Sequence, residues 1–398
     1  MRTSDRRFAF GVRPATRPTI GQADIIAVIT TSIAVPEGRL GAVRTTTPVK
    51  GDRTDLTASY TAVSRSVKSQ GLLQRARGFY LLVATGLVLA TAADVTGMVL
   101  LGHSWYQLIL AGVLGLIFTQ FAFLSHEAAH RQIMTSGPAN DRLGRYIGTF
   151  IVGMSYAWWM NKHTRHHANP NQVGKDPDIA VDTISFLEED AAKRTGIMAL
   201  ITRRQGYLFF PLLTLEGVNL HLTSFRHLFG RGQVKRRKTE IALLVARFAL
   251  YLGALFVFLP PGMAAAFLGV QLAVFGVYMG ASFAPNHKGM PIIPADVKLD
   301  FFSKQVLTSR NIRGGWWATI LFGGLNYQVE HHLFPSMARP HLSQARLIVR
   351  QHCDTADVPY TETSMGRSYA IVVAYLNRVG LQARDPFACP VVAQYRGV

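Results

Sequence analysis

"FYLLVATGLVLATAADVTGMVLL" (residues 79–101) and "YQLILAGVLGLIFTQFAFL" (residues 106–124) decide the fold. Each stretch is close to the ~20 apolar residues that a helix needs to span a bilayer. Neither contains a Lys or Arg, and Asp94 is the one charged residue in the first. The link between them is long enough only for a tight turn. The two stretches therefore predict a transmembrane hairpin.

A second pair of apolar stretches follows later in the chain. "IALLVARFALYLGALFVFL" (241–259) and "AAAFLGVQLAVFGVYMGASFA" (264–284) are joined around Pro260-Pro261-Gly262. Shorter apolar stretches at 147–160 and 206–219 are expected to lie in the membrane interface. The sequence thus predicts an all-α, multi-pass membrane protein with four transmembrane helices in two hairpins.

The composition supports a membrane protein. Hydrophobic residues make up 49% of the 398 residues and charged residues only 16%, too few to cover a soluble globule of this size. The formal net charge of +19 is compatible with a nucleic-acid-binding protein or with loops beside anionic lipid. Together with the apolar stretches, the charge leads us to expect membrane lipid as a partner, and no nucleic acid.

The distribution of positive charge predicts the orientation. Neither hairpin turn contains a Lys or Arg, whereas the long segments outside the spans are rich in them. By the positive-inside rule, both turns face outward. We therefore expect both termini and the central region on the cytoplasmic side of the cell's inner or plasma membrane, where the central region forms a helical cap.

The ends of the chain differ in composition from its body. Residues 1–54 are expected to form a basic, disordered arm, and residues 386–398 a C-terminal tail. The segment 55–75 has the apolar spacing of an amphipathic helix leading into the membrane. The main domain is expected to span 55–385. Cys353 and Cys389 cannot form a disulfide framework, so free thiols in a reducing compartment are expected.

Seven of the thirteen histidines fall into three tight groups. Spacings of three and four residues place side chains on one face of a helix, so each group can offer its imidazoles to a common point. In the predicted topology all three groups meet on the cytoplasmic side, just outside the bilayer. The groups are "HEAAH" (126–130), "HTRHH" (163–167) and "QVEHH" (328–332).

The number of histidines indicates more than one metal. A catalytic zinc site uses three protein ligands and a water molecule, whereas seven histidines suggest two metal ions. Imidazole suits zinc, copper, iron and nickel alike, so ligand type alone does not choose the metal. "HEAAH" also fits the HExxH pattern of a zinc peptidase, in which Glu127 would be the general base. That function leaves the other two groups without a role.

Three longer phrases carry a resemblance to a known family. "HEAAH", "HTRHHANPNQVGKDPDI" (163–179) and "GGLNYQVEHHLFPSMARPHL" (323–342) resemble the three histidine boxes of the membrane-bound fatty acid desaturases. The similarity runs from about residue 55 to about 380 and includes "VPYTETSMGRSYA" (358–370). Because glutamine begins the third box, the chain is most similar to the front-end, acyl-lipid branch, of the Δ6 type that acts on linoleoyl-CoA.

The resemblance implies a set of metal ligands. It adds a histidine just after the fourth span, in an Asn-His pair that matches Asn286-His287. Glu127 becomes a residue that orients an imidazole through its free N–H, and Asp176 and Asp178 either do similar work or close a turn. Asn286 joins these supporting residues. The implied ligands are His126, His130, His163, His166, His167, His287, Gln328, His331 and His332.

The resemblance also implies the reaction. Two iron ions and O2 would remove two hydrogens from a long-chain acyl lipid or acyl-CoA and leave a cis double bond. The expected position of this double bond is Δ5 or Δ6, near the carboxyl end. No HPGG haem motif of a fused cytochrome b5 occurs in the sequence. A separate ferredoxin or other reductase is therefore the expected electron donor, and the basic chain would attract an acidic carrier.

For several aromatic residues and histidines, the position in the sequence alone predicts where they lie. Aromatic residues beside boxes two and three either line an acyl tunnel or form an interfacial belt. His221 and His227 are expected at the lipid surface, His103 in an outward turn, and His341 and His352 at the surface. The aromatic residues are Tyr156, Trp158, Trp159, Trp316 and Trp317.

Alternative functions remain open at this point. A related diiron hydroxylase, ketolase or sphingolipid desaturase would use the same ligands and differ in its product. An intramembrane HExxH zinc peptidase would use only the first group. A transporter or scaffold with a structural metal is a third class.

Overall fold

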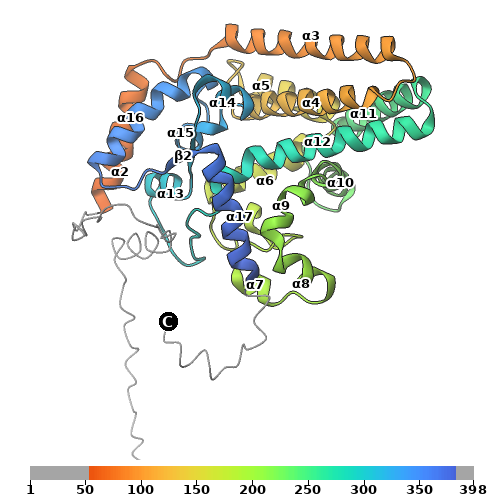
Figure 1. Cartoon of the computed structure of the whole chain (residues 1–398). Coiled ribbons are helices and arrows are strands. Elements are labelled where there is room, and N and C mark those ends of the chain that lie inside the picture. Colours follow the sequence, from red (N-terminus) through yellow and green to blue (C-terminus); the bar gives the residue numbers. More distant parts are fainter. Residues whose placement is uncertain (1–52, 382–398) are drawn as a thin grey trace, which may run out of the picture. The chain divides into compact units, whose positions relative to one another are not determined.

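The computed structural model describes residues 53–381 (Figure 1). The predicted tail over 386–398 and nearly all of the predicted arm over 1–54 lie outside the described residues. Arg53 and Thr54 belong to α2 (Arg53–Ser69), the helix predicted from the amphipathic pattern at 55–75. The described part is mostly helical, which agrees with the predicted helical class.

Within residues 53–381, four helices are long and apolar enough to cross a membrane. Figure 1 shows them running alongside one another. All four were predicted, but α4 and α12 extend past their apolar stretches into the histidine-bearing turns. The four are α3 (Arg77–Leu101), α4 (Gln107–Ala129), α11 (Arg237–Phe258) and α12 (Pro261–His287).

α4 and α12 form the centre of this bundle, whereas α3 is mostly exposed. The two central helices approach closely at Gly115, where an added Cβ would lie only 2.8 Å from the Gln271 carbonyl oxygen. Glycine is therefore required for this contact. Because the helices pack so closely, their C-terminal ends, which carry His126 and His287, are held in a fixed relation.

The segment after α4 returns the chain to the histidine-bearing ends. Ser136 caps α5 through a hydrogen bond from the Ala139 N–H, and Ser155 caps α6 through a bond from the Trp158 N–H. The predicted short apolar stretch at 147–160 is divided between a π-helix and α6, so it does not span. The elements are α5 (Gly137–Arg145), the π-helix η1 (Tyr146–Val152), α6 (Tyr156–Ala168) and the 3-10 helix η2 (Pro177–Ile179).

Four short helices connect η2 to α11. The apolar stretch at 206–219 is interrupted at Thr214 and Leu215, so it too forms no spanning helix. Tyr207 and Phe229 are exposed on these helices, and Leu215 is exposed between two of them. The helices are α7 (Glu188–Ala192), α8 (Gly196–Arg203), α9 (Gln205–Leu213) and α10 (Glu216–Phe229).

The chain after α12 completes the compact part of the molecule. Two three-residue strands, β1 and β2, pair in parallel, with Asn311 opposite Glu362. α2 packs against α13 and α16. The elements are α13 (Phe301–Leu307), β1 (Asn311–Arg313), α14 (Gly315–Leu321), the 3-10 helix η3 (Leu325–Tyr327), α15 (Gln328–Leu333), the 3-10 helix η4 (Arg339–His341), α16 (Leu342–Thr355), β2 (Glu362–Ser364) and α17 (Met365–Leu381).

Arg310 anchors the end of α12 to this C-terminal part. Its fully buried guanidinium group donates hydrogen bonds to the carbonyl oxygens of Pro285 and Lys288 and to the Ser368 hydroxyl group. The carbonyl groups at a helix C-terminus have no partner within the helix. Arg310 satisfies them, and it thereby fixes the turn that carries His287.

Candidate metal centre

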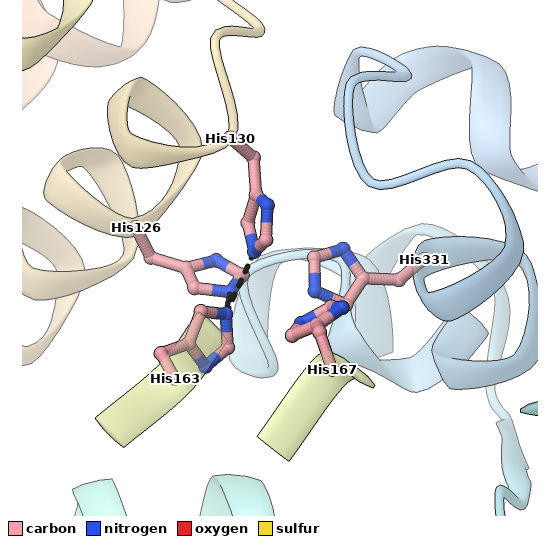
Figure 2. Close-up of side chains that lie close together, drawn as sticks. All are labelled: His126, His130, His163, His167 and His331. Atoms are coloured by element: carbon pink, nitrogen blue, oxygen red, sulfur yellow. Dashed lines mark hydrogen bonds between the residues drawn. The ribbon is translucent and has the colours of Figure 1, made fainter. Parts of the chain in front are cut away.

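Five histidines from three helices converge on one point. His126 and His130 come from the end of α4, and His163 and His167 from α6, while His331 comes from α15 (Figure 2). One nitrogen of each ring lies within 4.8 Å of a nitrogen of every other. The Nε2 atoms of His130 and His163 are 2.7 Å apart. We call these residues the five-histidine group.

Three more histidines form a second group beside the first. His166, His287 and His332 come from α6, α12 and α15, and their ligand nitrogens also lie within 4.8 Å of one another. The Gln328 amide nitrogen lies 2.8 Å from His287 Nε2. We call the three histidines with Gln328 the three-histidine group. The structure thus brings together all nine of the ligands that the resemblance implied.

Helix geometry explains how the residues divide between the groups. Each residue turns a helix by about 100°, so His163 and His167 share a face of α6 while His166 points to a neighbouring face. The adjacent residues His331 and His332 diverge in the same way on α15. Both helices therefore lie between the groups and contribute to each.

Each imidazole ring of the three-histidine group has a hydrogen-bond acceptor at its Nδ1 atom. His166 Nδ1 donates to both carboxylate oxygens of Asp176 at 3.0 Å, and His287 Nδ1 donates to the Thr308 carbonyl oxygen at 2.9 Å. His332 Nδ1 donates to Gln305 Oε1 at 2.8 Å. These bonds fix the tautomer of each ring and direct Nε2 into the group, as partners of metal-binding histidines do.

Gln305 also reaches the five-histidine group. Its Nε2 donates to the His167 carbonyl oxygen at 2.9 Å, so one fully buried amide holds His332 and the backbone of His167 together. Sequence reasoning did not find Gln305 or Thr308, because both lie on or beside α13, outside every histidine box. Only the folded chain reveals their role.

The donors fit metal ions. Buried polar atoms are normally hydrogen-bonded, yet His126 Nδ1, both nitrogens of His167, His331 Nε2 and His332 Nε2 are buried without a hydrogen-bond partner among the described residues. Where these nitrogens point into the two groups, bound metal ions would be their missing partners. Imidazole suits several transition metals, iron among them.

The protonation of the histidines also fits metal binding, because the ligand form of histidine is neutral. Burial, reinforced by neighbouring histidines, lowers the pKa of His163, His167, His331 and His332 well below its usual value. Burial alone lowers the pKa of His130 to about 3. The buried imidazoles are therefore neutral.

His166 is the exception. Burial acts to lower its pKa, but the carboxylates of Asp178 and Asp176 outweigh this and raise it. Asp176 also accepts hydrogen bonds from the backbone N–H groups of Asn171 and Asp178, at 2.7 and 2.9 Å. It therefore closes the turn and supports the histidine at once, so both of the roles considered for it from sequence occur together.

Asp178 and Asn286 make different contacts. The Asp178 carboxylate lies 3.0 Å from Lys162 Nζ and 3.4 Å from His166 Nδ1. Asn286 Nδ2 donates to Gln328 Oε1 at 3.2 Å and so contacts the three-histidine group directly.

Glu127 does not orient an imidazole, in contrast to the expectation from sequence. Its carboxylate accepts two hydrogen bonds from the Arg339 guanidinium group, at 2.6 and 2.7 Å. Tyr80 from α3 lies 3.4 Å from the same carboxylate. The neighbouring Arg339 cation, which sequence reasoning missed, binds this carboxylate more strongly than a neutral imidazole could. Nor is the carboxylate free to act as the general base of a zinc peptidase.

A second buried carboxylate, Glu330, lies on α15 between Gln328 and His331. Glu330 accepts hydrogen bonds from Asn311 Nδ2 at 2.7 Å and from the Tyr360 hydroxyl group at 2.8 Å. Burial raises the pKa of Glu330 to about 7, although these bonds act against the rise. Asn311 Oδ1 also accepts a hydrogen bond from the Val329 N–H at 2.9 Å. β1 therefore holds α15 in place.

A cavity of about 220 Å³ adjoins both groups. His163, His166, His287 and Gln328 line it. Most of the remaining lining residues are apolar, and a few are charged. The apolar part includes Trp158, Trp159, Phe186, Phe209, Leu213 and Phe283, and the charged residues are Lys162, Asp178, Glu216 and Lys288.

The aromatic residues named from sequence separate into two sets. Trp158 and Trp159 line the cavity, and the Trp159 ring stacks on His163 with centroids 4.1 Å apart. Tyr156 instead donates its hydroxyl group to Asp141. Trp316 and Trp317 are exposed on α14.

Two of the other histidines depart from their expected surface positions. His341 is partly buried, and its Nδ1 donates to the Leu72 carbonyl oxygen at 2.9 Å. His221 is partly buried, and its Nδ1 donates to the Gly217 carbonyl oxygen at 2.6 Å, so it is not a lipid-surface residue. A helix-to-helix contact with the Phe275 ring explains its burial. His103 is exposed, as expected.

Comparisons with known proteins agree with this arrangement. The family model described as "Fatty acid desaturase" matches residues 103–364. A Δ8-fatty-acid desaturase from Helianthus annuus is 28% identical over 83% of this chain and 75% of its own length. A Δ6-fatty-acid desaturase from Caenorhabditis elegans is 27% identical over 81% and 74%. A Δ8-(E)-sphingolipid desaturase from Kluyveromyces lactis is 26% identical over 73% and 54%.

The family match covers both histidine groups, the cavity beside them and three of the four long helices, α4, α11 and α12, whereas α3 precedes the matched residues. It therefore includes the clustered imidazoles together with the helices that carry them. The chain belongs to the fatty acid desaturase family and is an oxidoreductase of the acyl desaturase class.

Proposed function

We propose that the protein is a front-end desaturase, which inserts a cis double bond into a long-chain acyl group near its carboxyl end. The observation that carries this proposal is the pair of histidine groups bordering one largely apolar cavity. Relatives named as Δ8- and Δ6-fatty-acid desaturases support it. We propose a Δ5 or Δ6 position for the new double bond.

The nine side chains of the two groups are proposed to hold two iron ions. When bound, the irons would supply the activation of O2 that removal of hydrogen from an unactivated methylene group requires. His126, His130, His163, His167 and His331 would hold one iron, and the three-histidine group the other. Gln305, Asp176 and the Thr308 carbonyl group would keep the imidazoles oriented.

The remaining wall of the cavity is proposed to bind and orient the acyl chain. Trp158 and Trp159 would pack against its methylene groups beside His163 and His166, and the apolar wall would exclude water from the reacting carbons. The Lys162 and Lys288 ammonium groups stand at the same cavity. They would attract the phosphate or carbonyl groups of an acyl lipid or acyl-CoA.

We propose that the site faces the cytoplasm and receives electrons from a separate ferredoxin or another reductase. The hairpin turns at 102–106 and 259–260 contain no Lys or Arg, which supports this orientation. The net charge of +19 would favour association with an acidic electron carrier.

Expression in a host that supplies a reductase and polyunsaturated acyl chains tests the proposal. Gas chromatography of the membrane fatty acids should show a new unsaturated species with the wild-type chain. His331→Ala should abolish this species, whereas His227→Ala, which alters a histidine outside both groups, should preserve it. If the wild-type chain is present in the membrane and no new species forms, the proposal is wrong.

A sphingolipid is the second candidate substrate, because one relative is named as a Δ8-(E)-sphingolipid desaturase. The same cultures distinguish the two. An unsaturated long-chain base in hydrolysed sphingolipids, with unchanged fatty acids, would favour the sphingolipid. A product that gains oxygen instead of losing hydrogen would indicate a hydroxylase or ketolase.

A further inference from the structure

An apolar stripe lies on one face of α10. Its members are three or four residues apart, and on a helix that spacing keeps side chains on one face. Val218, Leu222 and Phe229 are exposed, and Phe225 is partly buried. We call these four residues the α10 stripe. A contiguous exposed apolar surface of this kind indicates a further neighbour.

A different face of α10 packs against the long helix α12 (Figure 1). An added Cβ at Gly217 would clash with the Leu272 carbonyl oxygen, so the two helix backbones are in close contact there. Ser224 and Leu228 share this buried face with Gly217. At 100° per residue, the buried face lies roughly a third of a turn from the α10 stripe. The stripe therefore points away from α12.

The α10 stripe meets the apolar surface of α11. The Phe225 ring packs against the Phe248 ring of α11, with centroids 5.2 Å apart. Val245 and Leu250, on either side of Phe248 in the sequence, are exposed. α11 is long and apolar enough to cross a membrane. The stripe is therefore continuous with a surface that suits lipid, which favours lipid as its neighbour.

A basic segment joins α10 to the start of α11. Residues 217–239 contain six Lys or Arg residues and no Asp or Glu. Five of the six side chains are exposed, and Arg237 is partly buried. Within residues 53–381, none of the six forms an ion pair with a carboxylate, and Glu240, the next acidic residue along the chain, is buried and paired with Arg145. We call residues 226–238 the basic segment, and its cations are Arg226, Arg231, Lys235, Arg236, Arg237 and Lys238.

We propose that the α10 stripe and the basic segment together bind anionic phospholipid. The stripe packs among the acyl chains, and the Lys and Arg side chains bind the headgroup phosphate, to which a guanidinium group can donate two parallel hydrogen bonds. Four to eight Lys or Arg residues beside a spanning helix attract anionic lipid, each by about fivefold.

Phospholipid matches this surface better than a soluble acidic protein does. Such a protein would neutralise the cations but would leave the α10 stripe exposed, whereas an anionic phospholipid provides both a negative headgroup and apolar chains. No residue of the stripe or of the basic segment belongs to the metal centre or lines the cavity beside it. The proposal is therefore independent of the proposed reaction.

Photolabelling of the full chain in phosphatidylcholine nanodiscs tests this proposal. Two probes are compared in trace amounts, a phosphatidylglycerol and a phosphatidylcholine that carry the same photoreactive diazirine on an acyl chain, and labelled peptides are mapped by mass spectrometry. We expect phosphatidylglycerol to label peptides from residues 217–238 at least about tenfold more than phosphatidylcholine, since two contacts at about fivefold each exceed that factor. Salt at 1 M should reduce this ratio, because it screens exposed charges.

Replacement of four exposed cations of the basic segment by Gln should reduce the ratio at least about fivefold. The matched control removes the same charge from exposed positions elsewhere and should preserve the ratio. The test variant combines Arg231→Gln, Lys235→Gln, Arg236→Gln and Lys238→Gln, and the control combines Arg65→Gln, Lys68→Gln, Lys193→Gln and Arg350→Gln.

Arg231→Gln alone, which alters one exposed side chain, should lower the ratio less and in the same direction, so the test does not depend on the folding of the fourfold variant. Equal labelling of residues 217–238 by the two probes in the wild-type chain would overturn the proposal. So would an equal fall of the ratio in the fourfold variant and its control. Protection of the basic segment from hydrogen exchange by an acidic ferredoxin, without any preference for phosphatidylglycerol, would assign the surface to a protein instead.

Discussion

Glu127 and Arg339 form a buried, two-bonded ion pair that joins the first histidine box to the segment after the third. The side chains are 2% and 4% exposed, and the two nitrogen–oxygen distances are 2.6 and 2.7 Å. Glu127 lies one residue from His126. The pair therefore holds the end of α4 against η4 and fixes the position from which two ligands project.

Arg339→Ala should destabilise the protein strongly. Removal of one partner of a buried pair leaves an uncompensated charge and costs about 3–5 kcal/mol. Thermal unfolding in detergent micelles measures the loss. The comparison is Arg346→Ala, which should cost less, because the Arg346–Glu362 pair is 23% and 10% exposed and water can partly solvate the carboxylate that is left. Equal losses for the two variants would contradict the structural role of Glu127.

Gln305→Leu should weaken metal binding without removing any ligand. Loss of a residue that orients metal-binding histidines typically costs about 10–100-fold in metal affinity. Gln305→Glu retains the acceptor for His332 but loses the donor to the His167 carbonyl group, so it should recover most of the affinity. Iron titration monitored by absorbance checks both variants. Wild-type affinity in Gln305→Leu would show that the bridge is unimportant.

Chelation should lower the melting temperature, because ions bound only to the folded state stabilise it. We expect the wild-type protein to contain about two metal ions per chain, in line with the number of clustered histidines. The melting temperature should recover on addition of iron but not of magnesium, since imidazole is a poor ligand for magnesium. An unchanged melting temperature would argue against metal binding in both groups.

Gly323→Ala should destabilise the turn that precedes the third box. Gly323 has a φ angle of +58°, and an added Cβ would lie 2.4 Å from Phe123 Cγ on α4. A strained backbone with a steric conflict costs about 1–3 kcal/mol. Gly366→Ala is the control, because Gly366 is exposed on α17 and its added Cβ meets no atom within 4 Å. Similar melting temperatures for the two variants would contradict the prediction.

Much of this arrangement could be predicted from sequence. The apolar stretches located the four long helices, because hydropathy over ~20 residues is a strong signal. Hydropathy, however, predicted C-terminal ends for α4 and α12 that lie too early in the sequence. Their last turns are polar but buried, and they carry His126 and His287. Hydropathy cannot distinguish such turns from the start of a loop.

The division into two groups could also have been predicted. The 100° step of a helix separates His166 from His163 and His167, and this inference needs only the sequence. The contacts of Gln305 and Arg339 could not be predicted in this way. Their partners lie 27 and 212 residues away. Gln305 lies outside every histidine box. Arg339 lies within the phrase that resembles the third box, but no spacing in that phrase indicates Glu127 as its partner.

Front-end desaturation is tested most directly with an acyl substrate labelled with deuterium between its carboxyl group and its first existing double bond. We expect a product that has lost one deuterium from each of two adjacent carbons, with a cis double bond there and no added oxygen. Mass spectrometry locates both changes. A product that retains all its deuterium, or that gains oxygen at one of these carbons, would contradict front-end desaturation.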